Sequence, residues 1–219
     1  MKAKLMAMLL AAVMVLSACG GSGNSNKPAD TSKNDTPAET PAEPSTPSTP
    51  TTPSEPAEFN GKLQGPFVMT TCGQSTGSVM FHMVAVQAGK TSVDEHQLLD
   101  SDMDSVAAGA KTLVITTGTS GKGMGAAGTD VDDEIERCTA VAEKAKSMGM
   151  LVVCAHVEGM SRRTDANDQA SIDAILPLAD VIVCVKDSDS DGLFSSYAES
   201  NNVPIIIVED TLGLGEYME

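Results

Sequence analysis

Residues 116–128, TTGTSGKGMGAAG, lie between the apolar run Thr112–Ile115 and a helical pattern that begins near Asp130. Five glycines fall within eleven residues, 118 to 128, so the backbone can turn sharply and come close to another group. Free N–H groups at the start of the following helix favour an anion. The stretch therefore predicts an anion-binding loop after a strand of an α/β sheet. A glycine-rich turn that serves packing alone is the alternative.

Two known nucleotide-binding motifs do not fit this loop. The pattern Gly123-x-Gly125-x-x-Gly128 has the dinucleotide-binding spacing, but that motif belongs in the first strand–helix unit, with an acidic residue about 20 residues further on. Here the acid at the end of the next strand is Glu158, and the loop follows a later strand. Lys122 is followed by glycine rather than Ser or Thr, which excludes a P-loop.

Strands and helices alternate along residues 60–219. Strand-like runs that are apolar on both faces indicate a parallel sheet with helices on both sides. Right-handed crossovers then predict a three-layer, doubly wound parallel sheet of five to six strands, flavodoxin-like or Rossmann-like, in the order 2-1-3-4-5-6. The expected strands are 66–71, 92–99, 112–117, 151–156, 181–185 and 205–208.

Two helices have the clearest patterns. Asp130 is the expected N-cap of the longer one, whose inward positions are Val131, Ile135, Cys138, Ala142 and Ala145. The helix after the first strand is expected to bury Val79, Met80, Met83, Val84 and Val86.

The first 19 residues have the pattern of a lipoprotein signal peptide. Lys2 and Lys4 precede an apolar run, 5–16, that is too short to span a bilayer. The run ends in Leu-Ser-Ala-Cys at Cys19, which resembles the bacterial lipobox. It predicts acylation of Cys19, for example with palmitate, and a chain anchored in the cell membrane on its extracytoplasmic face. An ordinary secretory signal with an incidental cysteine is the alternative.

Residues 20–59 are predicted to be a disordered tether. They hold eight of the eleven prolines among Ser, Thr, Glu and Ala, without apolar periodicity. Such a chain spans about 35 Å on average and roughly 120 Å when fully extended. Residues 60–219 are then a single α/β domain.

The predicted domain is strongly acidic. Residues 60–219 contain ten Lys and Arg against 24 Asp and Glu, a formal charge of −14. Such a field argues against nucleic acid as a partner and against anionic lipid. Its four cysteines, Cys72, Cys138, Cys154 and Cys184, show no C-x-x-C spacing. They are expected in the core, and a Cys154–Cys184 disulfide is the alternative.

Four segments carry a distinctive pattern: 71–75 (TCGQS), 120–128 (SGKGMGAAG), 162–163 (RR) and 191–194 (DGLF). Together they resemble a bacterial family of secreted or lipoprotein α/β domains known as domain of unknown function 6305, and the likeness covers about 64–210. It implies an exported domain but no activity. This chain has cysteine at position 72, where the resemblance leads us to expect a small residue, so cysteine chemistry does not follow from it.

The candidate ligand site lies where strand order reverses, between the first and third strands. Lys122, Arg162 and Arg163 fall in loops at this edge, where they could hold a carboxylate or phosphate. The alternative is that the two arginines pair with acids such as Glu158 or Asp165. The ligand-binding residues that we predict are Gly73, Gln74, Ser75, Gly118, Ser120, Lys122, Gly123, Gly125, Arg162 and Arg163.

Other chemistries are less well supported. A hydrolase or transferase could use His156 as acid or base, or Cys72 as nucleophile, in the same crevice. The hydroxyl-rich turn 74–78 partly resembles a flavodoxin phosphate loop, but the domain has no Trp to flank a flavin, so no cofactor is expected and FMN is the alternative.

No metal site is predicted either. Asp187, Asp189 and Asp191 resemble the start of a calcium loop, but Ala198 stands where the bidentate Glu is required. Asp191 is expected to cap the next helix instead. The leading hypothesis is therefore a lipid-anchored domain that binds a small anionic or nucleotide-like ligand, and an interaction protein without a small ligand is a third class.

The lipobox generates a direct prediction. Replacing Cys19 with serine removes the thiol that is acylated, so the Cys19→Ser chain should leave the membrane fraction or accumulate as an uncleaved precursor. Cell fractionation and intact-mass measurement of both chains test this. A wild-type chain that is soluble and carries no lipid mass would contradict it.

Overall fold

The computed structural model describes residues 58–219. The predictions for the signal peptide, for Cys19 and for the tether up to residue 57 lie outside this range. No helix among the described residues is long and apolar enough to cross a membrane.

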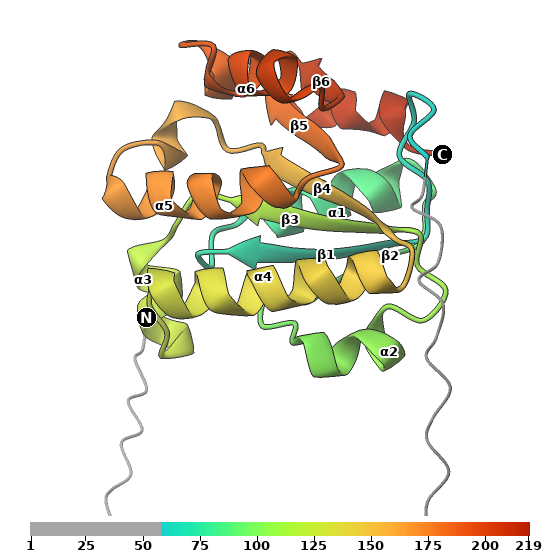
Figure 1. The fold of residues 1–219 in the computed structure, drawn as a ribbon, viewed down its shortest axis with the longest axis horizontal. Coiled ribbons are helices and arrows are strands. Elements are labelled where there is room, and N and C mark those ends of the chain that lie inside the picture. The colour runs from blue at the N-terminus through green and yellow to red at the C-terminus, as the bar shows by residue number, and fades with distance from the viewer. Residues whose placement is uncertain (1–57) are drawn as a thin grey trace, which may run out of the picture. The chain divides into compact units, whose positions relative to one another are not determined.

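The described domain is built on one sheet of six parallel strands in the order β2-β1-β3-β4-β5-β6 (Figure 1). This confirms the predicted architecture and strand order. The strands are β1 (Phe67–Cys72), β2 (Ser92–Asp94), β3 (Thr112–Thr117), β4 (Leu151–His156), β5 (Val181–Val185) and β6 (Ile205–Val208). The weakly predicted second strand is the shortest, with three residues at one edge of the sheet.

Helices cover both faces of the sheet unequally. Figure 1 shows α4 and α5 in front of the strands and α1 behind them. The helices are α1 (Gly77–Gln87), α2 (Met103–Val106), α3 (Gly121–Ala127), α4 (Val131–Ser147), α5 (Ala166–Ile175) and α6 (Leu193–Asn201). Residues of α2, α4, α5 and α6 join one core cluster, whereas α1 and the C-terminal 3-10 helix η5 (Thr211–Tyr217) join the other.

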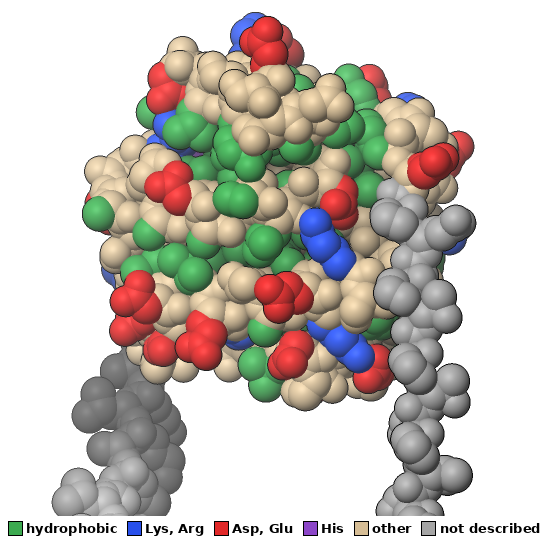
Figure 2. All heavy atoms as spheres, viewed as in Figure 1, with side chains coloured by type: hydrophobic (Ala, Val, Ile, Leu, Met, Phe, Trp, Pro, Cys, Tyr) green, Lys and Arg blue, Asp and Glu red, His purple; other side chains and the backbone are tan. Residues whose placement is uncertain are grey.

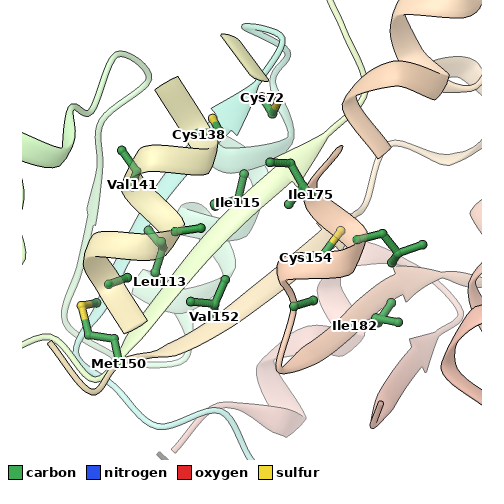
Figure 3. Packing of buried hydrophobic residues seen from close by; sticks show 14 of the residues in the cluster. Cys72, Leu113, Ile115, Cys138, Val141, Met150, Val152, Cys154, Ile175 and Ile182 are labelled. Carbon is green, nitrogen blue, oxygen red and sulfur yellow. The ribbon is translucent and has the colours of Figure 1, made fainter. Parts of the chain in front are cut away.

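The strand sequences are apolar throughout because side chains alternate between two faces of the sheet and helices cover both faces. In β3, Leu113 and Ile115 belong to the cluster under α4, and Val114 belongs to the cluster under α1. Successive side chains point to opposite faces, and both faces are covered. Figure 3 shows Leu113, Ile115 and Val152 packed against Val141 of α4 and Ile175 of α5.

The long helix α4 begins as predicted. The Asp130 side chain accepts hydrogen bonds from the N–H groups of Asp132 and Asp133, 3.0 and 3.1 Å away. Acids in its first turn and Lys144 and Lys146 in its last turn complement the helix dipole. Figure 2 shows acidic side chains over the face that α4 covers.

Two predictions about local structure are wrong. The glycine-rich stretch is not an open loop, because residues 121–127 form α3, with Ser120 accepting from the N–H of Gly123 and left-handed Gly128 ending the helix. In α1 the buried side chains are Phe81, Val84 and Ala85, while Met83 and Val86 are 64% and 56% exposed. The inward face of α1 is thus set by Phe81, which the predicted pattern omitted.

A pair of substitutions in α1 tests this inward face. Phe81→Ala removes a fully buried ring and should lower the free energy of unfolding by about 3–5 kcal/mol. Met83→Ala removes an exposed side chain and should change it by no more than about 0.5 kcal/mol. Urea unfolding of both variants measures this, and equal losses would contradict the assignment.

Candidate functional site

The β1–α1 and β3–α3 turns meet at the carboxyl edge of the sheet, as the strand order predicts. Gln74 and Thr119 form an antiparallel bridge, and the N–H of Ser120 donates to the carbonyl of Gly73 over 2.7 Å. Gly73 has a φ of 122°, and a Cβ there would lie 2.6 Å from Thr119 Cγ2. Gly118 has a φ of 98°, and a Cβ there would lie 2.6 Å from Arg162 Cβ. Because they lack a Cβ, Gly73 lets the β1–α1 turn contact the β3–α3 turn, and Gly118 lets the segment that carries Arg162 pack on the β3–α3 turn.

A buried carboxylate, Glu134 of α4, occupies the β1–α1 turn. Its Oε2 accepts from the N–H of Gly73 over 3.1 Å, and both oxygens lie 3.0 Å from Gln74 Nε2. Arg137 lies one turn further along α4 and pairs with Glu134 at 2.7 Å. Arg137 also donates to the carbonyls of Thr71 and Leu98, at 2.6 and 2.9 Å. The pair therefore joins α4 to the end of β1.

A second buried carboxylate, Asp168 of α5, holds the β3–α3 turn. Its Oδ1 accepts from both the N–H and the hydroxyl of Thr119 at 2.7 Å, and its Oδ2 accepts from the N–H of Thr164 at 2.9 Å. Burial opposes ionisation, but the hydrogen bonds from Thr164 and Thr119 outweigh it and hold the pKa of Asp168 below its usual range.

A third carboxylate, Glu158 after β4, lies at the N-terminus of α1. Its Oε2 accepts from the Thr76 hydroxyl at 2.8 Å and from Arg162 Nε at 3.1 Å, and its side chain is only 9% exposed. Burial raises the pKa of Glu158, but neighbouring hydroxyl groups and the Arg162 guanidinium outweigh this and keep it below its usual range. Its Oε1 is buried and makes no hydrogen bond with the described residues.

These three carboxylates change the picture of the predicted anion site. Gly73, Gln74, Ser75, Gly118 and Ser120 do gather at one edge, as the sequence predicts. However, Glu134 engages Gly73 and Gln74, and Ser171 Oγ accepts from the N–H of Gly118 at 2.9 Å. The hydrogen-bond donors that the sequence assigned to a ligand are thus largely engaged by the protein itself.

The remaining predicted ligand-binding residues lie in and beside α3. Ser120 caps this helix, and Lys122 in its first turn is exposed. Gly123 packs so closely on the carbonyl of Gln74 that a Cβ would collide with it, whereas a Cβ at Gly125 would meet nothing within 4 Å. Packing therefore requires glycine at position 123 but not at position 125.

Both arginines pair with acids, which is the alternative that the sequence left open. Arg162 bonds Glu158 and also donates to the carbonyl of Thr119 at 2.6 Å, so it lies over the β3–α3 turn. Arg163 makes a two-pronged pair with Asp191, at 2.7 Å for each oxygen, rather than with Asp165. This pairing holds the pKa of Asp191 at about 2.

The three aspartates of the calcium-like segment serve separate purposes. Asp187 accepts from the N–H of Met160 at 2.8 Å, and Asp191 binds Arg163. Asp191 also accepts from the N–H of Leu193 at 3.2 Å, and Asp189 accepts from the N–H groups of Phe194 and Ser195, so both hold the start of α6, whose N-cap position is Gly192 with a φ of 76°. Among the described residues no group of acidic, His and Cys side chains is arranged to hold a metal ion.

The two candidate catalytic residues are inaccessible. His156 and Cys72 are both 0% exposed. Burial lowers the pKa of His156 to about 4, and its ring nitrogens face the Thr117 hydroxyl at 3.0 Å and the Gly159 carbonyl at 3.3 Å. A hydrogen bond with Cys138 and burial raise the pKa of Cys72 well above its usual range. Neither group is poised as an acid, base or nucleophile for a ligand from solvent.

The other cysteines are core residues, as predicted. Cys138, Cys154 and Cys184 are buried and free, so the alternative Cys154–Cys184 disulfide is not formed. Burial raises the pKa of Cys154 and of Cys184 to about 12.

Glu134 and Asp168, which organise this edge, are not predicted from the sequence. Glu134 looks like one of several acids in the first turn of α4, and Asp168 lies in the first turn of α5. An exposed acid in the first turn of a helix and a buried acid there have the same neighbours in the sequence, so the sequence does not distinguish them. The one available signal is Arg137, a lone cation three residues after Glu134 on the half of α4 that faces the sheet.

Comparison with known proteins gives a family. The model of the family described as Domain of unknown function (DUF6305) matches residues 64–219. No curated protein matches the chain.

Three solved structures are similar at low identity. A GDSL-like lipase from Bacteroides thetaiotaomicron is 13% identical, with a TM-score of 0.35 over 67% of this chain and 68% of that one. A proposed acylhydrolase from Bacteroides fragilis is 11% identical, with a TM-score of 0.33 over 69% and 70%. The esterase EstA from a Pseudoalteromonas species is 9% identical, with a TM-score of 0.31 over 64% and 76%. Likeness at this level carries no argument about activity.

The buried imidazole generates a prediction for acid stability. The pKa of His156 is about 4 when folded and about 6.5 when unfolded, so the unfolded chain binds the extra proton. The free energy of unfolding therefore loses nothing to His156 above pH 6.5. As the pH drops from 6.5 to 4, protonation of the unfolded chain lowers it by about 3 kcal/mol. His156→Gln should flatten this slope, and Met83→Ala, at an exposed position of α1, should not. Urea unfolding between pH 7.5 and 4.5 measures the slopes, and equal slopes in wild type and His156→Gln would contradict the assignment.

Proposed function

The chain belongs to the DUF6305 family, and from its own geometry we propose that it is a lipid-anchored, extracytoplasmic binding domain. Its ligand is a small carboxylate or phosphate compound, including a nucleotide-like one, that binds at the carboxyl edge in the place of the Glu158 carboxylate. The anchor and location rest on the sequence pattern that ends at Cys19.

One observation carries this proposal: an oxyanion already lies at the N-terminus of α1. The Glu158 carboxylate receives the Thr76 hydroxyl and the Arg162 guanidinium there. A hydroxyl, a guanidinium and a helix N-terminus together are the groups that bind carboxylates and phosphates in proteins. Because the occupant is a side chain on a loop, a ligand with the same chemistry can take its place without any change in the sheet.

Access to this place is through Arg162. Its side chain is 29% exposed, whereas that of Glu158 is 9% exposed. Arg162 also donates to the Thr119 carbonyl. This second hydrogen bond keeps the guanidinium in place when its bond to Glu158 is replaced by a bond to the ligand. The Glu158 side chain competes with the ligand for Arg162 and Thr76. The more often Glu158 occupies the site, the lower is the apparent affinity for the ligand.

The acidic field restricts the ligand further. A domain with a formal charge of −14 over residues 60–219 repels polyanions. A small ligand with one anionic group fits this field better than a long polymer. No catalytic step is proposed, because His156 and Cys72 are buried.

Removing the internal competitor tests the proposal. In Glu158→Ala, phosphate should raise the unfolding temperature relative to chloride at equal ionic strength, because it binds the folded state alone. At ten times its dissociation constant the gain is about 1.4 kcal/mol, or roughly 3–6 °C for a domain of this size. The wild type should show a smaller shift. The measurement is thermal unfolding of the full chain in a non-ionic detergent.

Two further variants separate a site from a general salt effect. Arg162→Ala in the Glu158→Ala background should lose the phosphate shift, because the guanidinium is gone. Lys122→Ala in the same background should keep most of it, since Lys122 contributes charge from a different turn. Equal shifts in all of these chains would refute the proposal.

A further inference from the structure

The face of the domain opposite α4 carries apolar side chains that the core does not use. Met83 and Val86 on α1 and Leu212 on η5 are 64%, 56% and 67% exposed. These are three of the six large hydrophobic side chains that stand exposed among the described residues. All three line one groove between α1 and η5, with a volume of about 720 Å³. This volume lies within the range of small-molecule sites.

The lining of the groove is apolar and adaptable. Met80, Val84 and the three exposed side chains form most of it. Methionine has three rotatable bonds and a polarisable sulfur, so it adjusts to irregular apolar ligands. An apolar groove with two methionines suits a flexible chain better than a rigid, flat ring system.

Three of the four polar side chains that line the groove, those of Asp210, Thr211 and His82, are hydrogen-bonded within the protein, and the fourth is Gln87. Asp210 accepts from the N–H groups of Leu212 and Gly213, at 3.0 and 3.3 Å. Thr211 donates to the Val157 carbonyl at 3.0 Å, and His82 bonds the Ser92 hydroxyl at 2.9 Å. No Lys or Arg lines the groove, and Asp210 is its one acid. The part of a ligand that enters it is therefore uncharged and apolar.

The predicted anchor identifies where such a ligand comes from. The chain before residue 60 ends at Cys19, the predicted lipidation site, and this tether reaches roughly 120 Å at most. The domain is thus confined near a bilayer, whose amphiphiles it meets at high local concentration. A formal charge of −14 over residues 60–219 disfavours anionic head groups and a second copy of the same domain.

We propose that the α1–η5 groove binds the alkyl chain of a single-chain, zwitterionic membrane amphiphile. The alkyl chain lies against Met83, Val86 and Leu212, and the head group stays in solvent. This site is separate from Glu158 and Arg162 at the carboxyl edge, so it does not depend on the anion site; its choice of ligand rests on the lipid anchor of the proposed function.

Photocrosslinking of the full-length protein tests this. The protein is reconstituted in phosphatidylcholine vesicles with a trace of lysophosphatidylcholine whose acyl chain ends in a diazirine. After irradiation, mass spectrometry should place adducts in residues 77–90 and 208–217. Val86→Glu and Leu212→Glu put charges into the groove at exposed positions, where folding tolerates them, and should each lower the adduct yield at least tenfold. Leu99→Glu, at a 46% exposed position outside the groove, should leave it unchanged.

Three outcomes would overturn the proposal. Equal yields in wild type, Val86→Glu and Leu212→Glu would mean that the groove does not hold the probe. Equal yields from a two-chain phosphatidylcholine probe would mean that this face dips into the bilayer. An adduct yield that falls as the protein concentration in the vesicles rises would mean that a second copy covers the groove. Circular dichroism of each variant confirms that it is folded, so a lost adduct reports on the groove.

Discussion

The Glu134 carboxylate is the contact on which the carboxyl edge depends. It is 2% exposed, and it receives the Gly73 N–H, the Gln74 amide and the Arg137 guanidinium. A buried ion pair depends on further hydrogen bonds to offset the loss of hydration. Arg137 donates to two carbonyls of the neighbouring segments, although its Nε has no hydrogen-bond partner among the described residues. The contact fixes Gln74 in a left-handed conformation, with a φ of 55°, which non-glycine residues seldom adopt.

The geometry of the rest of the edge follows from that turn. With Gln74 held, the Gly73 carbonyl can receive the N–H of Ser120, and Ser120 can cap α3. Asp168 fixes the β3–α3 turn from the other side. Two buried carboxylates therefore hold the two turns that flank the reversal of strand order. Glu158 differs from them because its main partner, Arg162, is partly exposed, which is why we propose that a ligand replaces this carboxylate and not the other two.

The sequence predicts the sheet well and the site only in part, because local patterns define strands but not contacts between distant residues. Strands buried on both faces are apolar throughout, so their order and the edge where Gly73 and Gly118 meet can be derived from local patterns. The partners of those turns cannot, because Gln74 and Glu134 are 60 residues apart and Thr119 and Asp168 are 49 residues apart. Helix α3 was missed for a different reason: its glycines disfavour a helix, but the caps at Ser120 and Gly128 stabilise it.

The groove on the opposite face follows from the strand order itself. From β3 to β6 the sheet grows in one direction, and right-handed crossovers then place α4, α5 and α6 on the same face. Only the β1–β2 crossover runs in the other direction, so α1 is the one crossover helix on the second face of the described sheet, where η5 and the segment around Leu63 join it. Helix α1 must therefore bury Phe81 and Val84 against the sheet, and its outer residues have no second layer of helices over them. The exposure of Met83 and Val86 is thus a consequence of topology, and the sequence keeps them apolar although solvent alone would allow polar side chains there.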